Sequence, residues 1–235
     1  MRSPHSLAER DSAFTLMELL TVVAIISILM ALLLPVLNVV KNNARKAEAR
    51  SDCSNLQIAC RSYYTDYGVY PLNSNQASAG AAGTDTCYGD PNGLYSSADL
   101  CDILRAMPDS RYNTNNILNS RQVIYFEANN AKDQTNPKGG FYEGQGNGNA
   151  TSITGPAGNK ILPGSYLDPW GMEYVVFLDA NYDGNLNAAI QWFYYTNPIP
   201  AVNTSVAACS LGADHTWGAN GNGGFYASDD IATWQ

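Results

Sequence analysis

Residues 14–37 read FTLMELLTVVAIISILMALLLPVL, an apolar run with a single charged side chain, Glu18. A helix needs about 20 apolar residues to cross the hydrocarbon core of a bilayer, and this run is long enough. It lacks the small-residue end of a secretory signal peptide. We therefore expect it to be retained as the transmembrane half of an N-terminal helix, in contact with membrane lipid. Residues 1–13 form a short polar segment before it.

Glu18 needs an explanation of its own. A carboxylate in or near a bilayer is costly unless it lies at the interface or has a partner. One interpretation places Glu18 at the interface, at the start of the helix, where the macrodipole favours a negative charge. Its position inside the run leaves a functional interpretation open as well.

Helical periodicity continues beyond the apolar run. Gly68 follows the last periodic residue and Pro71 comes shortly after it, which is a typical stop signal. Residues 38–71 are therefore predicted to be an amphipathic stalk helix, continuous with the transmembrane half. Small and apolar residues recur along it at spacings of three and four: Val40, Ala44, Ala47, Leu56, Cys60, Tyr63 and Tyr67.

The remainder of the chain is more polar. Residues 72–165 are rich in Gly, Asn, Ser and Ala, and we expect a loop-rich variable insertion with a short helix at 97–107 and a strand at 123–126. Residues 166–235 are expected to be a C-terminal antiparallel β-region. The sequence therefore predicts an α+β fold, with the long helix packed on a small antiparallel sheet. Two strand candidates flank a turn-rich segment of the β-region: 173–178 and 189–195.

Composition excludes several functions. The chain has 13 Lys+Arg against 21 Asp+Glu, a formal net charge of −8. Phosphate binding needs a basic surface, so nucleic acid is not an expected partner. The sequence has no nucleophile-elbow, P-loop or zinc-protease motif, and its two histidines are His5 and His215. We expect no enzymatic activity.

The five cysteines leave two alternatives open. Cysteines outside the cytosol usually pair as disulfides. Cys53 and Cys60 lie two turns apart on the predicted helix, about 10 Å, and cannot bridge each other. Each would need Cys87, Cys101 or Cys209 as its partner. Buried free thiols are the alternative.

The first candidate metal site is a turn-rich segment in the β-region. Asp179, Asn181 and Asp183 supply oxygen ligands at positions 1, 3 and 5 of a calcium-type loop, and Gly184 stands at position 6. Position 12 is Ile190, so the carboxylate that completes an EF-hand loop is missing. The alternative is a turn that needs no metal.

The second candidate is a set of acids near the C-terminus: Asp214, Asp229 and Asp230. Hard oxygen ligands on both sides of a loop can bind Ca²⁺ and close the loop. Spacing alone favours the alternative, in which these acids are simply solvated.

The start of the apolar run resembles the leader of a type IV prepilin. The similar stretch is Ala13-Phe14-Thr15-Leu16-Met17-Glu18-Leu19-Leu20. The resemblance implies that prepilin peptidase removes residues 1–13 as a leader peptide, cutting between Ala13 and Phe14. It also implies N-methylation of Phe14, and pairing of Glu18 with the N-terminal amine of a neighbouring subunit during assembly. The expected fold is then pilin-like.

Three further stretches resemble the major pseudopilin of type II secretion systems: 63–71, 167–174 and 210–214 with 230–234. This resemblance implies calcium as a cofactor, bound by Asp214 and an acid of the Asp229–Asp230 pair, with the carbonyl of Leu211. It implies a self-assembled filament that drives protein export, with minor pseudopilins and an inner-membrane assembly platform as partners.

The implied location is a single pass through the inner membrane, with the C-terminal domain in the periplasm. The positive-inside rule favours the opposite orientation, because basic residues follow the apolar run: Lys41, Arg45, Lys46 and Arg50. We follow the resemblance, because prepilin cleavage requires a cytoplasmic leader. Two other functions remain open: a type IV pilin or minor pilin for adhesion or DNA uptake, and a binding module on a membrane stalk.

Overall fold

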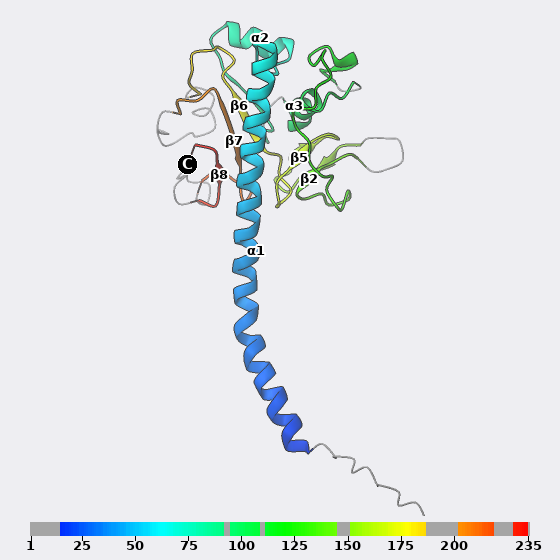
Figure 1. Ribbon diagram of the computed structural model, residues 1–235, viewed down its shortest axis with the longest axis vertical. Helices are drawn as coiled ribbons and strands as arrows, with labels where there is room; N and C mark the ends of the chain where they lie inside the picture. Colours follow the sequence, from blue (N-terminus) through cyan, green and yellow to red (C-terminus); the bar gives the residue numbers. More distant parts are fainter. Residues whose placement is uncertain are drawn as a thin grey trace, which may run out of the picture. The chain divides into compact units, whose positions relative to one another are not determined.

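The computed structural model describes residues 15–91, 95–108, 111–144, 151–186, 202–218 and 228–234. The chain divides into two compact units, Met1–Ala44 and Arg45–Gln235. Helix α1 (Leu16–Tyr67) is 52 residues long and has residues in both units (Figure 1). The predicted continuous helix is therefore confirmed. It ends at Tyr67, at the predicted Gly68 stop signal, so residues 68–71 of the predicted stalk are not helical. Gly68 has a φ of +71° and donates its N–H to the Tyr64 carbonyl.

The described part of the first unit is the apolar portion of α1. Its large hydrophobic side chains are exposed, from Leu16 at 81% to Val40 at 56%. This helix is long and apolar enough to cross a membrane, with a mean hydropathy of 2.8 over its most apolar window. Exposure of such a surface indicates that lipid or other protein covers it.

The second unit is built on the C-terminal part of α1. The predicted stripe is confirmed at Leu56, Cys60 and Tyr63, which are buried. Nearer the apolar run the prediction is wrong: Ala44 and Ala47 are exposed. The buried face begins only where the sheet begins to cover the helix, and its full set is Ala49, Cys53, Leu56, Ala59, Cys60 and Tyr63.

A four-stranded antiparallel sheet packs against this helix (Figure 1). The strand order is β1-β6-β7-β8. Val176, Val206 and Ala208 share a core cluster with α1, while Phe177 and Cys209 point into a second cluster on the other face. The expected α+β arrangement is thus present. The strands are β1 (Thr86–Tyr88), β6 (Val175–Leu178), β7 (Val206–Ser210) and β8 (Ile231–Ala232).

Residues 72–165 contribute more than loops. They supply β1, the edge strand of the main sheet, which pairs with β6. Strand β2 pairs with β5, and β3 pairs with β4. The elements outside the main sheet are α2 (Ser74–Ala81), α3 (Ser97–Leu104), the 3₁₀ turn η1 (Thr114–Asn116), β2 (Gly140–Phe141), β3 (Ile153–Thr154), β4 (Lys160–Ile161) and β5 (Tyr166–Leu167).

Three predictions about local structure need correction or fall outside the described chain. The helix expected at 97–107 ends at Leu104. No strand forms at 123–126, because Tyr125 and Phe126 donate their N–H groups to the carbonyl of Leu104, the last residue of α3, and not to a strand. The second hairpin strand was expected at 189–195, which lies outside the described residues; the observed partner of β6 on that side is β7.

All five cysteines are free thiols. Cys53, Cys60, Cys101 and Cys209 are buried, and Cys87 is half-buried. Of the two alternatives that the sequence left open, the structure has buried thiols.

Candidate functional sites

The N-terminal site is a capping box at the start of α1. The backbone N–H and the hydroxyl of Thr15 donate to Oε2 of Glu18 at 2.9 and 2.8 Å. The N–H of Glu18 donates back to the Thr15 hydroxyl at 3.2 Å. This reciprocal pair satisfies donors that a helix start leaves unpaired. Glu18 is exposed, so its carboxylate caps the helix and is also accessible to a second molecule. Ala13 and Phe14 lie outside the described residues.

The C-terminal site brings together three acids that are distant in sequence. Side-chain oxygens of Asp214, Asp229 and Asp230 lie within 4.8 Å of one another. Asp214 is exposed, Asp229 is half-buried, and Asp230 is buried. The sequence placed these residues on two sides of a loop, and the structure places them side by side.

Backbone groups orient these carboxylates. Asp229 Oδ2 accepts the N–H of Ala213, and Asp230 Oδ2 accepts the N–H of Gly218 at 2.8 Å. Gly212 has a φ of +69°, and a Cβ there would lie 2.7 Å from the Asp229 carboxyl carbon, so the loop requires glycine at this position.

The electrostatics of this cluster fit a divalent cation. Burial, helped by the charges of Asp214 and Asp229, raises the pKa of Asp230 to about 7. Within the described chain, Oδ1 of Asp230 is buried without a hydrogen-bond partner. Several hard oxygens around an unsatisfied carboxylate oxygen suit Ca²⁺. Leu211 is buried directly after β7, at the start of the same loop.

The calcium-type loop at Asp179 follows β6. The N–H groups of Asp183 and Gly184 donate to Oδ1 and Oδ2 of Asp179 at 3.1 and 2.9 Å. The amide of Asn181 accepts from Asp183 N–H at 3.0 Å and donates to Asp183 Oδ2 at 3.2 Å. These local bonds are those of a tight Asx-rich turn, so they fit both interpretations of the sequence.

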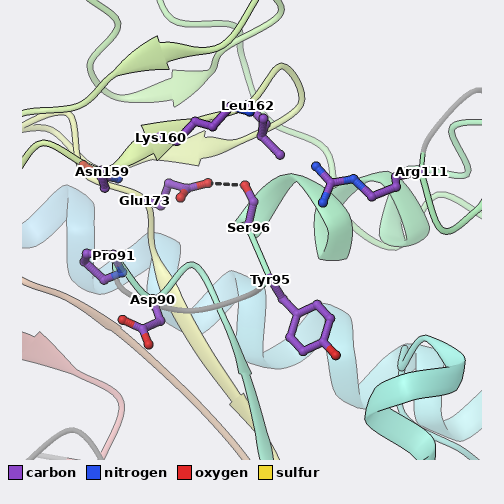
Figure 2. Close-up of a pocket in the computed structure, with 9 residues that line it drawn as sticks. All are labelled: Asp90, Pro91, Tyr95, Ser96, Arg111, Asn159, Lys160, Leu162 and Glu173. Carbon is purple, nitrogen blue, oxygen red and sulfur yellow. Dashed lines mark hydrogen bonds between the residues drawn. The ribbon is translucent and has the colours of Figure 1, made fainter.

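A polar cavity of about 190 Å³ lies between α3 and the β4–β6 region. Figure 2 shows the hydroxyl of Ser96 hydrogen-bonded to Glu173 on its wall. Oε1 of Glu173 also accepts from the hydroxyls of Ser97 and Ser165 at 2.9 and 2.6 Å. Glu173 therefore ties the N-terminus of α3 to β5. The nine residues that line the cavity include two acids and two bases: Asp90, Pro91, Tyr95, Ser96, Arg111, Asn159, Lys160, Leu162 and Glu173.

Sequence reasoning did not find this cavity. Its lining comes from four separate segments, and no short motif joins them. One local signal was available, because Ser96 and Asp99 have the spacing of a capping box and do form one at the start of α3.

Comparison with known proteins bears on the N-terminus. Residues 10–34 match the family model described as the prokaryotic N-terminal methylation motif. Neither the search of curated proteins nor that of solved structures found a match. The matched segment contains the expected cleavage junction, the capping box of Thr15 and Glu18, and most of the apolar run. This motif, together with the transmembrane-capable helix, supports a membrane-anchored, type IV pilin-like protein that prepilin peptidase processes.

Proposed function

We propose that the chain is a structural subunit of a type II secretion pseudopilus, which polymerises into a periplasmic filament that drives protein export. The observation that carries the proposal is the prepilin motif at residues 10–34, on a helix whose apolar part is exposed and whose later part packs on a sheet. Such a helix can reside in lipid before assembly and among neighbouring helices afterwards. One head-to-tail contact that repeats then gives an open filament and not a closed ring.

The N-terminal site at Glu18 and the C-terminal acid cluster each have a role in this proposal. After cleavage between Ala13 and Phe14, Glu18 pairs with the N-terminal amine of an adjacent subunit, which lowers the cost of its charge in the membrane. Calcium binds Asp214, Asp229 and Asp230 and holds the end of the chain on the sheet. When bound, the ion neutralises the crowded carboxylates, and the backbone donors of the loop keep them oriented.

The proposed partners follow from this role. The subunit contacts other copies of itself, minor pseudopilins, prepilin peptidase and the inner-membrane assembly platform. It crosses the inner membrane once, with the sheet-containing unit in the periplasm. The work is mechanical and non-catalytic, and a separate assembly ATPase supplies the energy.

A type IV pilin shares the motif and most of this mechanism, so the deciding experiment compares two phenotypes. Deletion of the gene should abolish export of secreted proteins and leave surface pili in place, and the wild-type gene should restore export. Loss of surface pili with normal export would instead identify a type IV pilin. Mass analysis of the mature N-terminus should find methylated Phe14.

The polar cavity favours the third function, a binding module on a membrane stalk, because its lining includes two acids, two bases and an aromatic ring. A screen of the full chain against glycans and small zwitterions tests this function. A ligand that is lost in Glu173→Gln, with export unaffected by deletion of the gene, would support it over the pseudopilus.

A further inference from the structure

Three cations on α1, Lys41, Arg45 and Lys46, follow the apolar run and are called here the basic collar. Lys41 is the first charged residue after Glu18, so residues 19–40 carry no charge. At 1.5 Å per residue this uncharged stretch spans roughly 33 Å, close to the roughly 30 Å of a bilayer's hydrocarbon core. Lys41 therefore lies where such a core would end.

The headgroup layer of a bilayer matches the length of the basic collar. A bilayer is about 40–45 Å thick with its headgroups and about 30 Å thick without them, so each layer is about 5–8 Å deep. Arg45 and Lys46 lie about 6 and 7.5 Å beyond Lys41 along the helix axis. The next charged residues, Glu48 and Arg50, lie more than about 10 Å beyond Lys41. The part of α1 at headgroup depth thus carries positive charge alone, in a chain with a net charge of −8.

The side chains of the basic collar extend toward the apolar run. Lys41 and Arg45 are exposed, and Lys46 is half-buried. Within the residues that the structure describes, the ion pairs involve other side chains. Each Cα–Cβ bond of a helix tilts toward the N-terminus, and the apolar run lies on that side of the collar. The long stems of Lys and Arg can therefore carry their charges back to the membrane surface.

The directions of these side chains favour a membrane over one protein partner. Successive residues of an α-helix differ in direction by about 100°. Lys41 and Arg45 therefore point to one side, about 40° apart, whereas Lys46 points about 100° away from Arg45. A partner subunit contacts one side of a helix, but a headgroup layer surrounds it. Headgroups can meet all three cations at once.

We propose that the basic collar binds the phosphate-bearing headgroups of anionic phospholipids and sets the depth of α1 in the bilayer. Each headgroup that a cation contacts should be preferred about fivefold over a zwitterionic one, because about 1 kcal/mol per cation converts at 1.4 kcal/mol per factor of ten. Salt should weaken this preference, since the charges are accessible to water. The proposal needs only that α1 is anchored in a membrane, so it is independent of the export function.

Native mass spectrometry of the detergent-solubilised full chain, titrated with phosphatidylglycerol or phosphatidylcholine, measures this preference. The wild type should bind phosphatidylglycerol about fivefold more tightly at each position that a cation contacts, and less so as salt is added. The combined variant Lys41→Gln, Arg45→Gln and Lys46→Gln should lose the preference. Glutamine is a good helix former, so α1 should remain intact.

A matched control changes the net charge by the same amount elsewhere in the second unit. It combines Lys132→Gln, Lys138→Gln and Lys160→Gln, all at exposed positions, and it should keep the preference. The proposal is overturned if the wild type binds both lipids equally or if the collar variant keeps the preference. It is also overturned if the control variant loses the preference to the same extent.

Filament yield of the collar variant separates lipid binding from subunit contacts. Loss of filaments with an unchanged lipid preference would show that these cations pair with acids of neighbouring subunits, and would overturn the proposal. Failure of the proposed filament function has a different signature. The wild type would then prefer phosphatidylglycerol as expected, while deletion of the gene left export normal.

Discussion

Replacement of Glu18 separates the two roles that the structure and the proposal give to this residue. Its Oε2 accepts two hydrogen bonds from Thr15, so it caps α1. In the proposed filament its charge also pairs with a neighbouring amine. Glu18→Ala removes the cap and the charge, whereas Glu18→Gln removes the charge alone, because Gln at this position also completes a capping box.

The expected magnitudes differ enough to distinguish these roles. Loss of a capping side chain costs about 0.5–2 kcal/mol, which the long apolar helix tolerates. Removal of one partner of an ion pair away from water costs about 3–5 kcal/mol. Since 1.4 kcal/mol is a factor of ten in an equilibrium constant, the subunit–subunit association constant should fall roughly a hundred- to several-thousand-fold in both variants.

The assay measures filament yield after cross-linking, in cells that carry the assembly machinery, together with the mass of the processed subunit. Both variants should be cleaved normally and should fail to form filaments. Thr15→Ala is the matched control: it removes the hydroxyl of the cap and leaves the charge, so it should assemble. Filaments at wild-type yield from Glu18→Gln would refute charge pairing and leave capping as the role of Glu18.

The remaining predictions concern the second unit. Leu56 is 1% exposed, so Leu56→Ala should lower the free energy of unfolding, measured in urea, by about 2–5 kcal/mol. Ile58 lies on the same helix but is 61% exposed, so Ile58→Ala should change this free energy by less than about 0.5 kcal/mol. Calcium should raise the Tm of the full chain by calorimetry, and Asp214→Ala should reduce that rise; an equal rise in the variant would contradict a site there. Burial raises the pKa of Asp102 from 3.8 to about 7 against the opposing effect of Arg105, so the folded state binds this proton more tightly than the unfolded state does. The contribution of this group to the free energy of unfolding is therefore present at low pH and lost as pH rises through about 7. In unfolding curves measured across pH, Asp102→Asn should reduce this loss of stability with rising pH.

The features that were predictable from the sequence are those that short-range chemistry determines. The end of α1 was marked by Gly68, whose positive φ few other residues adopt. The stretch 167–174, singled out by its resemblance to a pseudopilin, contains the turn before β6, Asp168-Pro169-Trp170-Gly171. In the structure, Oδ1 of Asp168 accepts the N–H groups of Trp170 and Gly171 at 2.9 and 2.8 Å, which explains why the turn begins with an acid.

Features that depend on contacts distant in sequence were not predictable. Strand β1 has three residues, too few for a period-two pattern, and it becomes a strand only through pairing with β6. The stripe on α1 was extended too far, to Ala44 and Ala47, because the pattern cannot show where the sheet stops covering the helix.

The buried cysteines have a consequence for the pseudopilus subunit proposed above, because that proposal places them in the oxidising periplasm. Thiolates, not thiols, react with oxidants and disulfides. Burial raises the pKa of Cys60 and of Cys87 to about 12 and holds the pKa of Cys101 and Cys209 well above its usual range. These sulfurs therefore remain protonated at neutral pH, and all but that of the half-buried Cys87 are also shielded from solvent. For the proposed subunit they predict folding without an oxidoreductase, and no sulfur cross-links between copies that await assembly in the membrane.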